Sequence, residues 1–168
     1  VGLIPENELS LEAGVTLDDR SKGAVVDENY QTDVEGIFAA GNVLHVHDLV
    51  DFVSMEAEKL AAAMARYIRE GGLPPCELDI KTDGNVTHTI PQKVSGKKSF
   101  RLAMRVRRPM KDGAIEITQD GKTVKRYKFK KALPAEMIQI PVEAEKLNGE
   151  APLEVTVKTC DSLPVLSS

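Results

Sequence analysis

The sequence predicts an α+β protein whose first part combines strands with one long helix and whose second part is an all-β, immunoglobulin-like sandwich. Residues 1–73 contain 5 Lys and Arg against 14 Asp and Glu, whereas residues 74–168 contain 17 against 12. Residues 71–75, Gly-Gly-Leu-Pro-Pro, end a helix and then prevent its extension, as linkers commonly do. Hydrophobic spacing also changes at this place, from helical to alternating. We therefore expect a boundary near Pro74, with domains at residues 1–73 and 76–168.

In the first part, two apolar runs predict strands and a third segment predicts a helix. Residues 23–27 are a short β-branched run that ends in polar residues, which is typical of a strand followed by a turn. Residues 36–41 have no polar face, and this favours a strand buried on both sides, as in a parallel sheet covered by helices. From residue 49 to residue 68 the apolar spacing is helical, and charged residues such as Glu56 lie mostly on the opposite side.

Residues 32–42 read Thr-Asp-Val-Glu-Gly-Ile-Phe-Ala-Ala-Gly-Asn. They resemble the closing motif of the pyridine nucleotide-disulfide oxidoreductase superfamily, which includes thioredoxin reductase. That family writes the motif as Thr-x-x-x-Gly-[Ile/Val]-[Phe/Tyr]-Ala-x-Gly-Asp, and the one named position that differs is Asn42. Residues 2–9 resemble the segment that closes the NAD(P) domain of the family, and residues 23–27 resemble a strand leading back into its FAD domain. The resemblance covers roughly residues 1–70.

The resemblance implies that the first part is the end of an FAD-binding α/β domain. In that family the motif's acidic residue hydrogen-bonds a ribityl hydroxyl of FAD, and backbone N–H groups at the start of the next helix face the flavin pyrimidine oxygen. These roles fall on Gly41 and Asn42 and on Val50 and Asp51, which are our candidate cofactor-binding residues. Asn42 keeps an acceptor oxygen and adds a donor, but it lacks the negative charge. The positive end of a helix suits the anionic reduced flavin.

Two features indicate a fragment of a longer flavoprotein. The sequence begins with Val1 rather than Met, and it contains no Gly-x-Gly-x-x-Gly segment for a pyrophosphate. We therefore expect the parent protein to bind FAD and NAD(P) through N-terminal domains that are missing from this sequence and that are the partners of its first part. We expect no cofactor bound to the fragment and no activity from it alone.

The cysteines and histidines identify no catalytic residue. Cys76 and Cys160 lie far apart in the sequence, and no His-Pro dipeptide typical of the glutathione reductase branch is present, so disulfide reduction is unsupported. The cysteine usage favours a reducing, cytoplasmic compartment. The run His45-Val46-His47-Asp48 admits a metal site, an approach of His45 or His47 to the flavin edge, or ordinary loop and helix-capping chemistry. We expect no metal site here.

The second part has period-two alternation, which predicts short antiparallel strands. In residues 100–107 the apolar Phe100, Leu102, Met104 and Val106 alternate with Arg101, Ala103, Arg105 and Arg107. Further strands are expected at residues 77–81, 86–90, 113–118, 122–129, 137–142 and 153–159. Asp-Gly and Asn-Gly turn signals separate them at residues 83–84, 112–113, 120–121 and 148–149. The antibody cysteine spacing and core Trp are absent, so "immunoglobulin-like" describes architecture alone.

Basic residues of the second part predict a positive face on this β-domain: Lys122, Lys125, Arg126, Lys128, Lys130 and Lys131, together with Arg101, Arg105, Arg107 and Arg108. Lysines on an edge strand commonly prevent strand addition, and the acidic first part offers a surface of opposite sign. The sequence has no Trp and few other aromatic residues for base stacking. We therefore expect this face to contact protein, either within the chain or on another subunit, and we expect neither nucleic-acid binding nor membrane insertion.

Two classes of function remain open. The enzyme interpretation is an FAD-dependent NAD(P)H oxidoreductase that passes hydride between the nicotinamide and the flavin and then to an unknown acceptor. The alternative is a non-catalytic protein-docking or assembly module, because a flavoprotein-like fold does not by itself confer redox chemistry. Upstream gene sequence with two Gly-x-Gly-x-x-Gly segments would favour the first.

Overall fold

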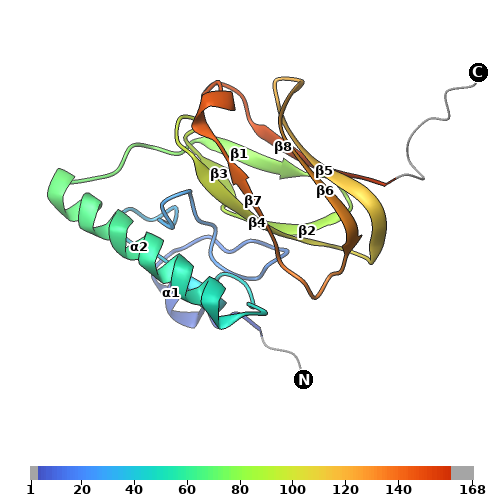
Figure 1. The fold of residues 1–168 in the computed structure, drawn as a ribbon. Coiled ribbons are helices and arrows are strands. Elements are labelled where there is room, and N and C mark those ends of the chain that lie inside the picture. The colour runs from blue at the N-terminus through green and yellow to red at the C-terminus, as the bar shows by residue number, and fades with distance from the viewer. Residues whose placement is uncertain (1–3, 160–168) are drawn as a thin grey trace, which may run out of the picture.

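The computed structural model describes residues 4–159 and has an α+β architecture, in which one long helix and several irregular segments precede two β-sheets (Figure 1). The helical elements are α1 (Glu8–Glu12), the 3-10 turn η1 (Gly41–Val43), α2 (Val50–Glu70) and the 3-10 turn η2 (Ala144–Lys146). The strands are β1 (Leu78–Thr82), β2 (Val86–Ile90), β3 (Lys93–Val94), β4 (Phe100–Val106), β5 (Met110–Gln119), β6 (Lys122–Ala132), β7 (Ile138–Val142) and β8 (Leu153–Thr159). Among the described residues, no helix is both long enough and apolar enough to span a membrane.

The helix α2 forms over the segment that the apolar spacing predicts. It begins after Leu49, whose backbone is extended, and it ends at Gly71, whose φ of 73° is the left-handed conformation that glycine adopts without steric cost. The N–H groups of Gly71 and Gly72 both donate to the carbonyl of Tyr67, the second at 3.1 Å. The predicted linker therefore starts as a helix C-cap.

The two strands predicted in the first part do not form, and this prediction is wrong for these residues. In the described structure, residues 23–27 and 36–41 take part only in isolated bridges, such as Leu17 with Ala24 and Gln31 with Phe38. Most of the second run is partly exposed rather than enclosed on both faces. A central strand needs a neighbour on each side for its N–H and C=O groups, and within residues 4–159 no strand lies beside this run to supply them.

The β part consists of two sheets with the strand orders β3-β1-β8-β5-β6 and β2-β4-β7. The β1–β8 pair is parallel, with Ile80 opposite Leu153, and the other pairs are antiparallel. The β5–β6 hairpin turns at Asp120 and Gly121, whose φ values are 50° and 71°. Two successive left-handed residues are typical of the tight hairpin turn that Asp-Gly predicts, so this prediction is confirmed.

The seven strands expected in the second part all form, with two differences. The short strand β3 was not expected, and the signal at Asp112-Gly113 lies inside β5 instead of in a turn. Gly113 pairs with Phe129 across the β5–β6 ladder, and a Cβ on Gly113 would lie 2.6 Å from that ring. Here glycine makes room for an aromatic neighbour. The likeness to an immunoglobulin sandwich stays a prediction.

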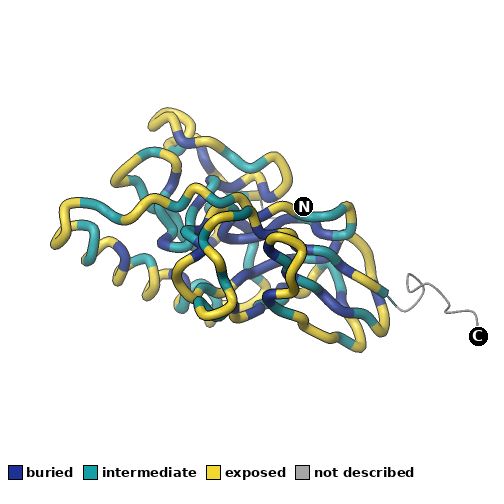
Figure 2. Tube along the Cα trace, turned by 90° about the horizontal axis from the view of Figure 1, so that it is seen from above, coloured by how far each residue is buried: buried dark blue, intermediate teal, exposed yellow. Residues whose placement is uncertain are grey.

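Two apolar cores hold the molecule together. In Figure 2 the buried residues, in dark blue, lie mostly inside the molecule, and exposed residues mark its turns. The larger core lies between the two sheets and contains fully buried residues from both, among them Leu102, Met104, Ile115, Ile140 and Val155. The smaller core crosses the linker, since it joins residues of the first part to residues of the second: Val15, Ala24, Val26 and Leu44 with Ile90, Ala103 and Met137. The first part is therefore packed on the sheet β2-β4-β7 through apolar contacts.

Candidate functional site

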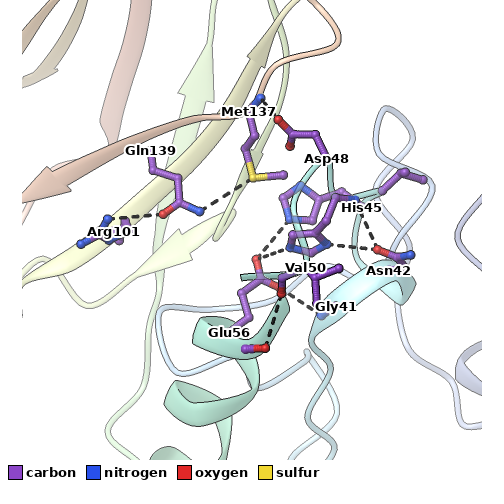
Figure 3. Close-up of polar contacts among 12 residues, drawn as sticks. Gly41, Asn42, His45, Asp48, Val50, Glu56, Arg101, Met137 and Gln139 are labelled. Carbon is purple, nitrogen blue, oxygen red and sulfur yellow. Dashed lines mark hydrogen bonds and ion pairs between the residues drawn. The ribbon is translucent and has the colours of Figure 1, made fainter. Parts of the chain in front are cut away.

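The four predicted cofactor-binding residues lie on the segment that runs from η1 into α2. Figure 3 labels three of them, Gly41, Asn42 and Val50. Gly41 is buried and has a φ of 77°, a conformation that favours glycine. Its N–H donates to Oε2 of Glu56 at 3.0 Å. Because α2 places Glu56 behind the loop, this N–H is satisfied from within the chain.

Asn42 is exposed, and its side chain organises the following loop. Its Oδ1 accepts the backbone N–H of His47 at 3.2 Å and lies 3.2 Å from His47 Nδ1. The oxygen that the motif would offer to a ribityl hydroxyl is thus engaged with His47 in this structure. In the described part of the chain, the hydrogen bonds of the Asn42 side chain involve Oδ1, which leaves the Nδ2 amide as a donor toward solvent.

Val50 and Asp51 form the first turn of α2 at the surface. Val50 is 80% exposed, and the preceding Leu49 is 55% exposed. The first N–H groups of a helix lack intrahelical partners and carry the positive end of its dipole. This end therefore offers an exposed, electropositive backbone surface with an apolar rim, whereas Gly41 and Asn42 are tied into hydrogen bonds one loop away.

Behind the loop, three histidines and a carboxylate form a cluster: His45, His47, His88 and Glu56. His45 is 2% exposed, and Glu56 is 4% exposed. The distance from Glu56 Oε1 is 3.2 Å to His45 Nε2 and 3.1 Å to His47 Nε2, and the second contact lacks hydrogen-bond geometry. On its other side, His45 Nδ1 lies 3.2 Å from His88 Nε2 of β2.

His45 and His47 were recognisable in the sequence as candidate site residues, whereas Glu56 and His88 were not. Glu56 was assigned to the charged side of the helix, and the structure shows that it is buried instead. The available signal was its spacing, because Glu56 lies four residues after Phe52 and four before Leu60, in line with the apolar stripe. His88 gave no comparable signal, since it reaches the cluster from a strand beyond the linker.

The cluster keeps its carboxylate ionised and favours the neutral forms of His45 and His88. Burial alone would raise the pKa of Glu56, but the contacts with His45 and His47 and the Gly41 N–H outweigh it and lower this pKa to about 2. Burial lowers the pKa of His45 below its usual value of 6.5. Burial, together with the neighbouring His45 and Arg105, lowers the pKa of His88 to about 4.

Arg105 of β4 joins this loop to the β part. Its guanidinium donates to the carbonyl of Val46 at 2.7 Å and to Asp48 Oδ1 at 3.2 Å. Asp48 Oδ2 in turn accepts the backbone N–H of Met137 at 3.2 Å. One arginine of the predicted positive face is therefore used within the chain. The lysines of β6 belong to the other sheet, so the two basic sets do not share a strand or a sheet.

The family model described as pyridine nucleotide-disulphide oxidoreductase matches residues 1–66. This match supports an origin of the segment in that oxidoreductase family, whose members generally bind FAD and NAD(P). No curated protein and no solved structure matches the chain.

The four candidate residues fit a flavin in part. The exposed start of α2 at Val50 and Asp51 presents N–H groups to an acceptor oxygen, and Asn42 Nδ2 presents a donor. The Gly41 N–H does not fit, because Glu56 accepts its hydrogen bond. Contacts of the flavin with Gly41 and Asn42 Oδ1 would require the loop to rearrange.

Proposed function

We propose that this chain is the C-terminal part of an FAD-dependent oxidoreductase in which hydride passes between NAD(P)H and flavin and on to an acceptor. The observation that carries the proposal is the family match over residues 1–66, whose motif at residues 32–42 leads into the exposed N-terminus of α2. Residues 1–73 form the end of the FAD/NAD(P)-binding region in this proposal, and residues 76–168 form an added β-sandwich domain of a cytoplasmic enzyme.

Exposed apolar side chains support a larger assembly around the first part. Large hydrophobic residues lie open on α1, on α2 and on the segments before them: Ile4, Leu9, Leu11, Leu49, Val50, Met64 and Ile68. Clusters of such residues mark surfaces that other protein covers. In the proposal the N-terminal domains of the parent protein cover this surface, and they also supply the phosphate-binding segments that the sequence lacks.

Flavin supplies the hydride-accepting chemistry when it is bound, and this chain supplies part of its surroundings. Asn42 would hydrogen-bond a ribityl hydroxyl, and the N–H groups at Val50 and Asp51 would face an electron-rich flavin oxygen. The positive end of α2 favours negative charge that develops at that oxygen. The isolated chain has no second half for this site, which is the reason we propose that it is inactive alone.

The test compares the 168-residue chain with the longer protein encoded by the complete gene. The short chain should purify colourless and show no saturable FAD binding at micromolar concentration, whereas the long protein should be yellow. In the long protein, Asn42→Leu should weaken flavin binding by about 1–3 kcal/mol, since it leaves a ribityl hydroxyl unpaired. Asn42→Asp, which restores the motif, is the matched control and should bind at least as well. If Asn42→Leu left the affinity of the long protein for FAD unchanged, Asn42 would not be a flavin-binding residue.

A non-catalytic docking module is the second candidate, and one observation favours it. Gly41 and Asn42 Oδ1 are satisfied by Glu56 and His47, as in a scaffold that needs no ligand. In this case the lysines of the edge strand β6 would meet an acidic protein subunit. A long protein that purifies without flavin and does not bind added FAD would favour this candidate over the enzyme.

A further inference from the structure

In the cluster behind the loop, two histidine rings and one carboxylate converge on a shared space. One ring nitrogen each of His45 and His47 and a carboxylate oxygen of Glu56 all lie within 4.8 Å of one another, and Nε2 of each histidine contacts Glu56 Oε1, at 3.2 Å and 3.1 Å. The three side chains come from two short stretches, the loop after η1 and the second turn of α2. Figure 3 labels two of them, His45 and Glu56. The side chain of His47 is 2% exposed, so water reaches these atoms poorly.

The protonation of His47 follows from its neighbours. Asn42 Oδ1 accepts the backbone N–H of His47, which identifies this atom as the oxygen, because an amide nitrogen cannot accept. His47 Nδ1 lies 3.2 Å from the same oxygen and therefore carries a proton. In the neutral ring, Nε2 is then left with a lone pair. That atom is buried, has no hydrogen-bond partner in the described residues and lies 3.1 Å from Glu56 Oε1.

The contacts of the second imidazole, His45, are compatible with the same arrangement. His45 Nδ1 is 3.2 Å from His88 Nε2, and its Nε2 is 3.2 Å from Glu56 Oε1. If Nδ1 donates to His88, both histidines present Nε2 lone pairs to the same carboxylate oxygen. A hydrogen bond from the Nδ1 of each ring to an outer acceptor is the arrangement that usually orients histidines which bind a metal through Nε2.

A single proton can pair only one of the two histidine Nε2 atoms with Glu56 Oε1, whereas a single metal cation can contact all three atoms. A proton on His45 Nε2 completes a hydrogen bond to Glu56 and leaves His47 Nε2 unpaired at 3.1 Å from a negative oxygen. An ion bound to all three atoms at ~2.0–2.1 Å in tetrahedral geometry separates its ligands by about 3.3–3.4 Å. The two nitrogen-to-oxygen distances of 3.2 Å and 3.1 Å are already close to this separation.

Contrary to the expectation from the sequence that residues 45–48 form no metal site, we propose that His45, His47 and Glu56 bind one divalent transition-metal ion of the Zn²⁺ class. Two imidazoles and one carboxylate are a common donor set for Zn²⁺, with the fourth position left to water or a ligand. A cavity of about 480 Å³, lined by His45, His47, Asp48, His88 and Arg105 among others, borders the cluster. The ion would fix the loop to α2 and thereby also fix Asn42. This proposal does not depend on flavin binding.

The first test uses the 168-residue chain after EDTA treatment and dialysis. Isothermal titration with Zn²⁺ should give one site per chain, and Co²⁺ should give the strong visible absorption of a four-coordinate ion without a thiolate charge-transfer band. Two-bond ¹H–¹⁵N spectra of the histidines should show the resonances of His45 and His47 Nε2 shifting on Zn²⁺ addition, while their Nδ1 atoms stay protonated. Absence of stoichiometric binding by the folded chain at micromolar Zn²⁺ would overturn the proposal.

Variants locate the site. His47→Gln and Glu56→Gln should each weaken Zn²⁺ binding by more than about 100-fold, whereas His88→Asn, which removes an outer partner, should weaken it by about 10–100-fold. Glu56→Gln retains an acceptor for the Gly41 N–H, so it is the variant least prone to unfold. Glu58→Gln on the exposed side of the same helix is the matched control, and Cys76→Ser tests the half-buried thiol. Both controls should bind normally. Undiminished binding in His47→Gln and Glu56→Gln would show adventitious binding elsewhere and sink the proposal.

Discussion

The two parts of the molecule obtain their stability in different ways. Residues 78–159 enclose their own core between two sheets, and Tyr127 is the one large hydrophobic residue that this described part leaves exposed. Residues 4–70 have a smaller core that depends on Ile90, Ala103 and Met137 from the other part, and they expose seven large hydrophobic residues. The comparison teaches that apolar composition alone does not make a self-sufficient unit, because the partner surface must also be present.

Separating the two parts should give the largest effect. Residues 76–168 expressed alone should keep a β-rich circular dichroism spectrum and unfold cooperatively. Residues 1–73 alone should show no cooperative unfolding, because in α2 only Glu56 and Ala63 are buried and an unsupported helix is marginal in water. Thermal melts of both fragments measure this. A cooperative transition in residues 1–73, or a dominantly helical spectrum from residues 76–168, would reverse the comparison.

Truncation of one side chain in each part should change the free energy of unfolding by amounts that differ by several kcal/mol. Leu102 is fully buried between the sheets, and Leu102→Ala should lower the free energy of unfolding by about 2–5 kcal/mol. Ile68 on α2 is 75% exposed, and Ile68→Ala should change the free energy of unfolding by less than about 0.5 kcal/mol. Urea denaturation of the two variants measures both values. A large loss in Ile68→Ala would mean that another copy of the chain covers α2.

Acidification should destabilise the contact between the parts before it affects the sheet core. In metal-free protein, His88 has a pKa of about 4 against 6.5 when unfolded, with His45, Arg105 and Asp18 as its charged or titratable neighbours. The unfolded chain therefore takes up the proton first, and stability falls as pH decreases from 6.5 to 4, by at most about 1.4 kcal/mol per pH unit. Glu56, with a pKa lowered to about 2, contributes stability above pH 4.5 that is lost as pH falls toward 2.

Urea midpoints measured in EDTA from pH 7 to pH 4 test this pH dependence. His88→Asn should flatten the curve between pH 6.5 and pH 4. A curve equally steep in this variant would assign the acid sensitivity to other groups.

Alanine substitutions at two glycines, one in each part, should show the smallest difference in stability between the parts. A Cβ on Gly23 would lie 1.9 Å from the backbone oxygen of Leu44, so Gly23→Ala forces two segments of the first part apart and should cost about 1–3 kcal/mol. Gly84, in the β1–β2 turn, has nothing within 4 Å of its Cβ position, so Gly84→Ala should be close to neutral. Differential scanning calorimetry compares the two variants. Equal melting temperatures would mean that the backbone at Gly23 can relax.

The sequence predicted the elements whose pattern is local. The alternation in residues 100–106 and the Asp120-Gly121 turn specify β4 and the β5–β6 hairpin from neighbouring residues alone. Residues 36–41 have an equally clear apolar pattern, but a buried strand also requires partner strands, and the described chain offers none there. The apolar character of residues 36–41 was read correctly, but the parallel sheet that it was taken to indicate is not present in the described structure.

The candidate site shows the same division. The motif identified Gly41 and Asn42, and the hydrogen bond from the His47 N–H to Asn42 lies within the same short loop. The burial of Glu56 was not predicted, because a carboxylate in an otherwise apolar helix pattern is usually assigned to the exposed side. His88 is brought to His45 by packing across 43 positions of sequence, and such tertiary contacts have no signature in a single sequence.

The parallel pairing of β1 with β8 has a consequence for the order in which the β part can fold. Ile80 of β1 pairs with Leu153 of β8, which the ribosome adds 73 residues later. Until β8 is made, β1 can pair only with the two-residue strand β3. The same late strand fills the space between β1 and β5. Closing so long a loop is slow, because the chain loses its entropy before the contacts form. During synthesis the β5 edge of the hairpin β5–β6 therefore stays unpaired in addition to the β6 edge, and the larger sheet is assembled only when its last strand, β8, has been made.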